Sequence, residues 1–149
     1  LIGFFDDNVA LKSQMVSHFG MCLGGTNELN SYDKELCLVV AIGNPKVIKL
    51  IVEKIHNPLI SFPNLIHPTA RCSDKKTFAI GKGNIIQGGC TFSCDVKIGD
   101  FNILNGSIVF GHDDSIGPLI LLCQQLEFLV RYQWVTETFS VLAPLFFSK

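Results

Sequence analysis

The sequence lacks a strong charge of either sign. Its 149 residues carry 12 Lys and Arg against 13 Asp and Glu, for a net charge of −1. The basic residues are scattered and form no stripe, which argues against a nucleic-acid-binding surface. Charged residues make up only 17% of the chain and hydrophobic residues 48%, a balance typical of globular proteins and not of disordered ones.

Long apolar runs are also missing. The most apolar stretches, PLILLCQQLEFLV (118–130) and SVLAPLFF (140–147), are too short to cross a bilayer. The N-terminus has no basic segment followed by an apolar core and a cleavage site, so no secretory signal is evident. We therefore expect a cytoplasmic protein without a membrane partner.

The cysteines do not have the spacing of metal ligands. Six of them occur, at positions 22, 37, 72, 90, 94 and 123. Because nothing else indicates secretion, we expect reduced and mostly buried thiols. Cys90 and Cys94, even with His112, lack the second pair of ligands that a zinc site uses, so we expect no metal.

The first part of the chain has the pattern of an α/β segment. LIGFFDDN (1–8) is typical of a strand that runs into a turn, and ELCLVVAIG (35–43) of a strand buried on both faces. Asn44 is a suitable N-cap, and Pro45 a favoured first residue, for the amphipathic helix that follows. LISFPNLIHP (59–68) adds a further extended piece. The order strand, helix, strand predicts a βαβ unit with parallel strands.

From residue 80 the apolar period changes to six. At every third step the apolar residue is Ile followed by Gly, which makes a repeat of eighteen residues. Such a repeat, with three short strands per turn, predicts a parallel β-helix in which each apolar residue points inward and stacks on its counterparts one coil away. The residues at unbroken six-residue steps are Ile80, Ile86, Phe92, Ile98, Leu104, Phe110 and Ile116.

The rhythm is lost after Gly117, and we expect an irregular tail over 118–149. Reading the codons one nucleotide out of step restores part of the pattern, because Glu127–Phe128 can then give only Ile or Val and Trp134–Val135 must give Gly. We interpret the tail as a frameshifted continuation of the β-helix; the alternative is a genuine, unrelated C-terminal helix or hairpin. Residues 80–117 alone make about two coils, fewer than a solenoid generally needs, so we expect poor solubility and weak or absent activity.

Five motifs, in order along residues 1–117, resemble the hexapeptide-repeat acyltransferases that acetylate sugars. The resemblance is to the sialic acid O-acetyltransferase and nucleotide-amino-sugar N-acetyltransferase family. The motifs are GFFDDN (3–8), LGG (23–25), VVAIGN (39–44), FPNLIHPTA (62–70) and IGDFNILNGSIVFGHDDSIG (98–117).

The resemblance implies three regions. Residues 1–66 would be a partial Rossmann-like substrate-binding domain, residues 67–117 a left-handed parallel β-helix, and residues 118–149 the tail. Family members are homotrimers whose active sites lie between adjacent β-helices, where acetyl-CoA also binds. The family's first strand and its later coils have no counterpart in this sequence, so we expect a truncated chain.

The resemblance further implies transfer of an acetyl group from acetyl-CoA to a sugar or nucleotide sugar. His112 matches the family's catalytic His, a residue type suited to remove a proton near neutral pH. Asp113 beside it would orient the imidazole, although the sequence leaves Asp114 open for that role. No residue for acetyl-CoA is identified. The residues expected to face the acceptor are Asp6, Asp7, Gly43, Asn44 and Asn105.

Two other functions stay open at this point. The chain could be a non-catalytic β-helical scaffold or binding protein in which His112 is incidental, or an inactive fragment. The sequence does not distinguish O- from N-acetylation and does not identify the sugar.

Overall fold

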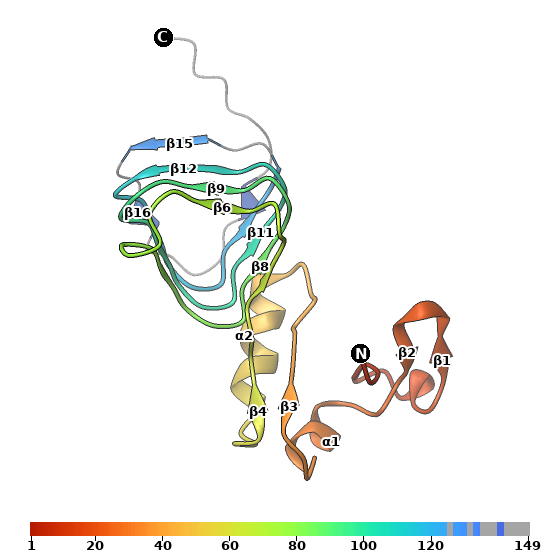
Figure 1. The fold of residues 1–149 in the computed structure, drawn as a ribbon. Helices are drawn as coiled ribbons and strands as arrows, with labels where there is room; N and C mark the ends of the chain where they lie inside the picture. The colour runs from red at the N-terminus through yellow and green to blue at the C-terminus, as the bar shows by residue number, and fades with distance from the viewer. Residues whose placement is uncertain (125–126, 131–132, 135–139, 142–149) are drawn as a thin grey trace. The chain divides into compact units, whose positions relative to one another are not determined.

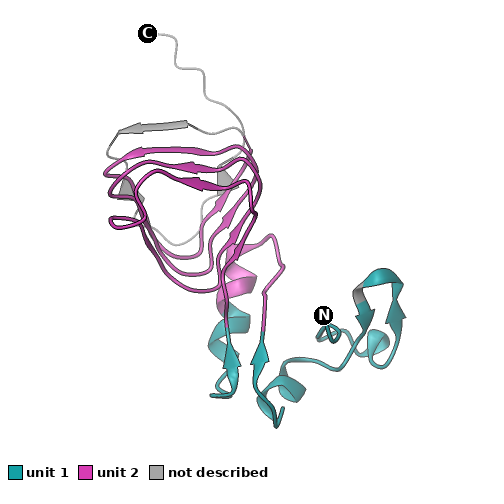
Figure 2. Cartoon of the chain, in the orientation of Figure 1, with its two compact units in different colours: residues 1–37, 50–61 teal, residues 38–49, 62–149 magenta. Residues whose placement is uncertain are grey.

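The structure is a computed structural model that describes residues 1–124, 127–130, 133–134 and 140–141. Contacts between residues divide the chain into two compact units (Figure 2). Unit 1 comprises residues 1–37 and 50–61, and unit 2 comprises residues 38–49 and 62–149.

Unit 1 is built from short elements. Strands β1 and β2 pair antiparallel, and Phe4 forms an isolated parallel bridge with Cys22. Strands β3 and β4 pair parallel, with Leu36 opposite Ile60. The elements are η1 (Val9–Leu11), β1 (Met15–Val16), η2 (Ser17–Phe19), β2 (Gly20–Met21), α1 (Thr26–Asn30), β3 (Leu36–Cys37) and β4 (Ile60–Ser61).

Helix α2 (Pro45–Lys54) connects β3 to the parallel β4, which confirms the predicted βαβ unit. The side chain of Asn44 accepts a hydrogen bond from the backbone N–H of Lys46 at 3.0 Å, and Pro45 is the first helical residue, as expected. Ile48, on the apolar face, is only 2% exposed.

The extended sheet of a Rossmann-like domain is not seen in residues 1–61, where each pairing joins only two strands. The expected second strand over 35–43 is reduced to the two residues of β3, and residues 38–43 enter no ladder. A sequence run rich in Val and Ile favours extended backbone, but a strand also needs partner strands along its length.

Unit 2 contains a parallel β-solenoid whose strands form three parallel sheets, one on each face of the solenoid (Figure 1). The sheets are β5-β8-β11-β14-β17, β6-β9-β12-β15 and β7-β10-β13-β16. The strands are β5 (Leu65–Ile66), β6 (Arg71–Cys72), β7 (Ala79–Ile80), β8 (Ile85–Ile86), β9 (Thr91–Phe92), β10 (Lys97–Ile98), β11 (Ile103–Leu104), β12 (Val109–His112), β13 (Ser115–Ile116), β14 (Leu121–Leu122), β15 (Glu127–Val130), β16 (Gln133–Trp134) and β17 (Ser140–Val141).

The inward residues stack as the six-residue period predicted. Ile98 pairs in register with both Ile80 and Ile116, and each step is one coil of eighteen residues. The rings of Phe92 and Phe110 are stacked with centroids 5.0 Å apart. Six of the seven predicted inward residues are buried, and Ile80 packs against them from the first coil.

The corners of the coils have a regular backbone. Every sixth residue from position 83 to position 119 has a positive φ, and the residue after it is buried. At one corner these buried residues form a ladder: the side-chain oxygen of Asn84 accepts from the N–H of Asn102, whose own side-chain oxygen accepts from the N–H of Ile120 at 2.8 Å. The residues with positive φ are Gly83, Gly89, Asp95, Phe101, Ser107, Asp113 and Leu119.

The expectation that the coil rhythm ends at Gly117 is wrong. Leu122 pairs with Leu104 and is completely buried, so β14 continues the coil in register. Pro118 does not interrupt the ladder, because the hydrogen bonds that join the coils on either side of it need no N–H from the proline: Gly99 donates to Ile116 and Leu119 donates to Asp100. Beyond Cys123 the tail is only partly described; 125–126, 131–132, 135–139 and 142–149 lie outside the described residues.

The number of coils also differs from the expectation. Stacking begins at β5, so the strands from Leu65 to Ile116 complete three coils instead of about two. Three coils are the usual minimum for a solenoid that buries a continuous core. The number of coils therefore gives no reason to expect poor solubility.

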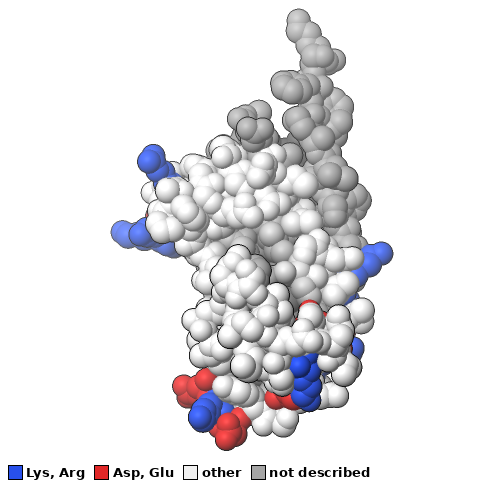
Figure 3. Space-filling model, turned by 90° about the vertical axis from the view of Figure 1, so that its right-hand side faces the viewer, with Lys and Arg blue, Asp and Glu red and all other residues white. Residues whose placement is uncertain are grey.

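None of the helices in the described part of the chain is long and apolar enough to span a membrane. On the face drawn in Figure 3, Lys and Arg lie in separate small groups among uncharged atoms, and Asp and Glu lie beside the groups in the lower part of the view.

Candidate active site

His112 and Asp113 form an exposed pair at one corner of the solenoid. The imidazole Nδ1 of His112 lies 3.0 Å from Oδ2 of Asp113, and the two side chains are 52% and 44% exposed. His112 is the last residue of β12, and Asp113 has a φ of 63°, a left-handed conformation that Asp tolerates better than most residues. The N–H of Asp113 donates to the carbonyl of Cys94 one coil below, which anchors the corner.

Asp114 is placed differently. It is the buried corner residue that follows Asp113, and only 1% of it is exposed. The carboxylate of Asp113 contacts the imidazole, whereas that of Asp114 is buried.

The pair has the chemistry of a general base. When Nδ1 carries its proton toward Asp113, the Nε2 atom of the neutral ring has a lone pair that can accept a proton from a substrate. The neighbouring carboxylate then stabilises the positive charge that develops on the ring. Both side chains are exposed enough for a substrate to reach them.

Asn105 directly follows β11, and its side chain is hydrogen-bonded to the neighbouring coils on both sides. Its Oδ1 accepts a hydrogen bond from Nε2 of Gln87 at 3.0 Å, and its Nδ2 donates to the carbonyl of Leu122 at 2.8 Å. The buried thiol of Cys90 donates to the backbone carbonyl of Asn105 at 3.3 Å, and burial raises the pKa of that thiol. The backbone and the amide of Asn105 are thus both held in place.

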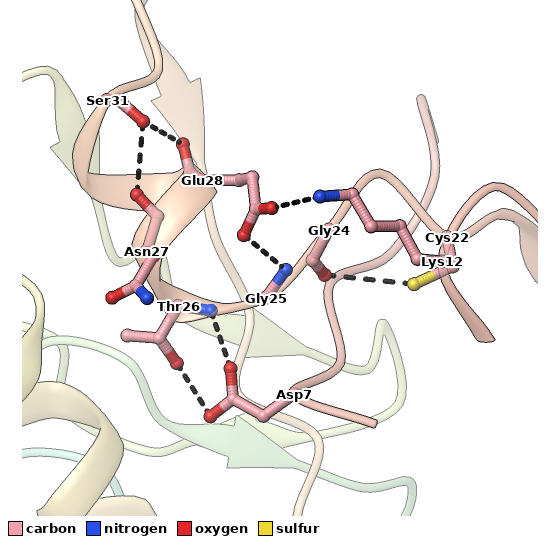
Figure 4. Close-up of polar contacts among 9 residues, drawn as sticks. All are labelled: Asp7, Lys12, Cys22, Gly24, Gly25, Thr26, Asn27, Glu28 and Ser31. Carbon is pink, nitrogen blue, oxygen red and sulfur yellow. Dashed lines mark hydrogen bonds and ion pairs between the residues drawn. The ribbon is translucent and has the colours of Figure 1, made fainter. Parts of the chain in front are cut away.

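The carboxylates of Asp6 and Asp7 accept hydrogen bonds within unit 1. Asp7 accepts from the N–H and the hydroxyl of Thr26, at 2.7 and 3.0 Å, at the start of α1 (Figure 4). Asp6 accepts from the N–H of Asn8 at 2.8 Å. Both carboxylates are exposed, and no sequence pattern indicated the contact of Asp7, because Thr26 lies nineteen residues further along the chain.

An ion pair lies next to this turn. Nζ of Lys12 is 2.6 Å from Glu28, whose other oxygen accepts from the N–H of Gly25 at 2.9 Å (Figure 4). The hydrogen bond from Lys12, together with that from Gly25, lowers the pKa of Glu28 to about 2. The cluster fixes the chain around the LGG motif.

Gly43 and Asn44 lie in unit 2, where the amide oxygen of Asn44 caps α2. A methyl group added at Gly43 would meet nothing within 4 Å, so the space around it is open. Asp6 and Asp7 belong to unit 1.

No group of three or more potential metal ligands occurs among the described residues. All six cysteines, which lie within the described part, are free thiols.

The fold has clear counterparts among acetyltransferases of known structure. No family model and no curated protein matches the chain. The acetyltransferase domain of PglB from Neisseria gonorrhoeae FA1090, in complex with acetyl coenzyme A, superposes with a TM-score of 0.66 at 28% identity, covering 81% of this chain and 57% of that one. A second structure of that domain gives a TM-score of 0.69 at 26% identity, covering 85% of this chain and 60% of that one.

A nucleotide-sugar enzyme is also similar. PerB from Caulobacter crescentus, in complex with CoA and GDP-perosamine, superposes with a TM-score of 0.61 at 27% identity, covering 70% of this chain and 50% of that one. A mutant of perosamine N-acetyltransferase from the same organism, with the same ligands, superposes with a TM-score of 0.62 at 25% identity. The superposition covers 74% of this chain and 52% of that one. This chain therefore spans between half and three fifths of the solved chains that it resembles.

Proposed function

We propose that this chain is an acetyl-CoA-dependent acetyltransferase of the hexapeptide-repeat sugar acyltransferase family, and that it acetylates the amino group of a nucleotide-linked amino sugar. The observation that carries the proposal is the exposed His112–Asp113 pair at a corner of a parallel β-helix. The similarity to proteins solved with acetyl coenzyme A, and with CoA and GDP-perosamine, supports this choice of donor and acceptor. It also favours an amine over the hydroxyl of sialic acid as the acceptor.

In the reaction that we propose, His112 accepts a proton from the acceptor amine as the amine nitrogen attacks the thioester carbonyl. A C–N bond forms, the C–S bond of acetyl-CoA breaks, and the proton held by His112 returns to the leaving thiolate. Asp113 holds the ring through Nδ1 and stabilises its protonated form, as a carboxylate does for a catalytic His elsewhere.

The remaining assignments are part of the same proposal. Residues 1–66 would form the partial Rossmann-like substrate-binding domain, with the acceptor facing Asp6, Asp7, Gly43 and Asn44. Asn105 would contact the sugar.

The assembly and the tail complete the proposal. Residues 67–117 would belong to a left-handed β-helix that forms a cytoplasmic homotrimer with its sites between adjacent subunits. Residues 118–149 would be a frameshifted continuation of the β-helix, within which β14 pairs in register with β11.

The proposal is tested with the chain as it stands. Acetyl-CoA is supplied with GDP-perosamine, a UDP-linked amino sugar or free sialic acid, and both thiol release and the mass of the product are measured. We expect thiol release that depends on a nucleotide-linked amino sugar and yields its N-acetyl derivative. Thiol release that no acceptor increases, or acetylation of sialic acid alone, would overturn it.

A further inference from the structure

We propose that Gln87 is a positioning residue that orients the amide of Asn105 toward the acceptor. This inference rests on the proposed function, since it assigns a role within the same site. It concerns a side chain that no motif in the sequence marked as functional.

Gln87 and Asn105 occupy equivalent positions on neighbouring coils. Each follows the inward residue of its strand, Ile86 on β8 and Leu104 on β11, and these two strands pair in parallel register. The backbone N–H of Gln87 donates to the carbonyl of Leu104, and that of Asn105 donates to the carbonyl of Leu122. The side-chain bond from Gln87 to Asn105 thus runs beside the backbone ladder from one coil to the next.

The polarity of these contacts selects one orientation of the Asn105 amide. The carbonyl of Leu122 can only accept, so it requires the nitrogen side of the amide, at 2.8 Å. Nε2 of Gln87 can only donate, so it requires the oxygen side, at 3.0 Å. A flip of the Asn105 amide would place its oxygen against the Leu122 carbonyl, and it would also break the bond to Gln87 in the orientation that the Gln87 amide now has.

The amide of Asn105 is oriented but not saturated. A primary amide has two N–H groups and two lone pairs on its oxygen. Among the described contacts one N–H goes to Leu122 and one lone pair to Gln87, which leaves one donor and one acceptor of defined position for a ligand.

A ligand can reach this point. Gln87 is exposed and Asn105 half-buried. Gln87 also lines an open hollow of about 470 Å³ on β5 and β8 whose walls include His67 and Gly88. We therefore expect a sugar hydroxyl or amine to meet an Asn105 amide that Gln87 and the carbonyl of Leu122 already hold in one orientation.

The decisive variant is Gln87→Glu, which keeps the length of the side chain but replaces the donor by an acceptor against Oδ1 of Asn105. We expect the KM for GDP-perosamine to rise about five- to tenfold, because a hydrogen bond is replaced by a repulsive contact, and the KM for acetyl-CoA to stay within about twofold. Gln87→Leu, which removes the bond without repulsion, should raise the acceptor KM about threefold. Lys97→Gln, an exposed change on β10, is the matched control and should alter neither constant.

A double-mutant cycle separates positioning from general structure. In an Asn105→Ala background, Gln87→Glu should have no further effect on the acceptor KM, because its partner is gone. Additive effects, or an equal rise in both KM values, would overturn the inference.

Binding of GDP-perosamine by calorimetry gives the same comparison without turnover. A parent chain that neither binds nor acetylates the acceptor would refute the proposed function and this inference with it. A parent chain that binds it, with a Gln87→Glu variant that binds equally well, would refute this inference alone.

Discussion

Nδ1 of His112 and Oδ2 of Asp113 lie 3.0 Å apart although the two residues are neighbours in the chain. The contact depends on the left-handed backbone of Asp113, which ends β12 and begins the corner. Because the same turn buries the next residue, Asp114, the corner presents one carboxylate to the imidazole and removes the other from solvent.

Asp113→Asn should lower kcat about 10- to 100-fold, because the variant loses the charge that stabilises the protonated ring. Asn is well tolerated at a positive φ, so the corner itself should persist. Asp95→Asn, at the equivalent corner position one coil below, is the matched control and should leave kcat unchanged. Steady-state kinetics would give kcat for both variants. An equal loss of kcat in the two would show that the charge beside His112 has no special role.

Leu122→Ala should lower the free energy of unfolding by about 2 to 5 kcal/mol, the usual cost of a cavity in a packed core. Leu122 is completely buried, whereas its neighbour Leu121 on the same strand is only half-buried. Leu121→Ala should therefore cost much less. Urea unfolding of the two variants tests whether the solenoid continues past Gly117, and equal small effects would show that it does not.

Asn102→Ala should destabilise the solenoid by about 1 to 3 kcal/mol, because the N–H of Ile120 would lose its acceptor in a buried corner. Asn27→Ala, on helix α1 and exposed, serves as a control with little expected effect. Thermal or urea unfolding measures both. If the Asn102→Ala variant were as stable as the parent chain, the ladder of buried amides would contribute nothing to stability.

The pair formed by Lys12 and Glu28 should make unit 1 sensitive to acid. The hydrogen bond from Lys12 is the largest cause that lowers the pKa of Glu28 from 4.5 to about 2. The stabilisation is therefore fully present above about pH 4.5 and is lost as the pH falls toward 2. Between these values the parent chain should lose more stability than Glu28→Gln, measured by urea unfolding at a series of pH values. Parallel curves for the two proteins would contradict this.

The solenoid could be predicted from the sequence because its contacts repeat at a fixed distance along the chain. The period of six alone identifies Ile86, Phe92 and Leu104 as core residues, and all three are buried. The loss of the Ile-Gly pattern after Gly117 led to the wrong end point for the solenoid, since Leu122 still pairs with Leu104 one coil away.

Contacts between segments that no sequence repeat relates could not be predicted. The bonds of Asp7 to Thr26 and of Asn57 to the carbonyl of Tyr32 join segments of unit 1 that no repeat relates. Within the site, the motif alone indicated that Asp113 lies beside His112. The side-chain bond from Gln87 to Asn105 was not, because only the stacking of coils brings the two amides together.

The most direct test of the account is the rate of acetyl-CoA thiol release with GDP-perosamine as acceptor, compared between the parent chain and His112→Ala. Unfolding curves of both proteins would confirm that the exposed substitution leaves the fold intact. We expect the variant to lose about 100-fold or more of the acceptor-dependent rate, because the imidazole is the general base in the proposed reaction. Equal rates in the two proteins would contradict the assignment of His112 as the general base.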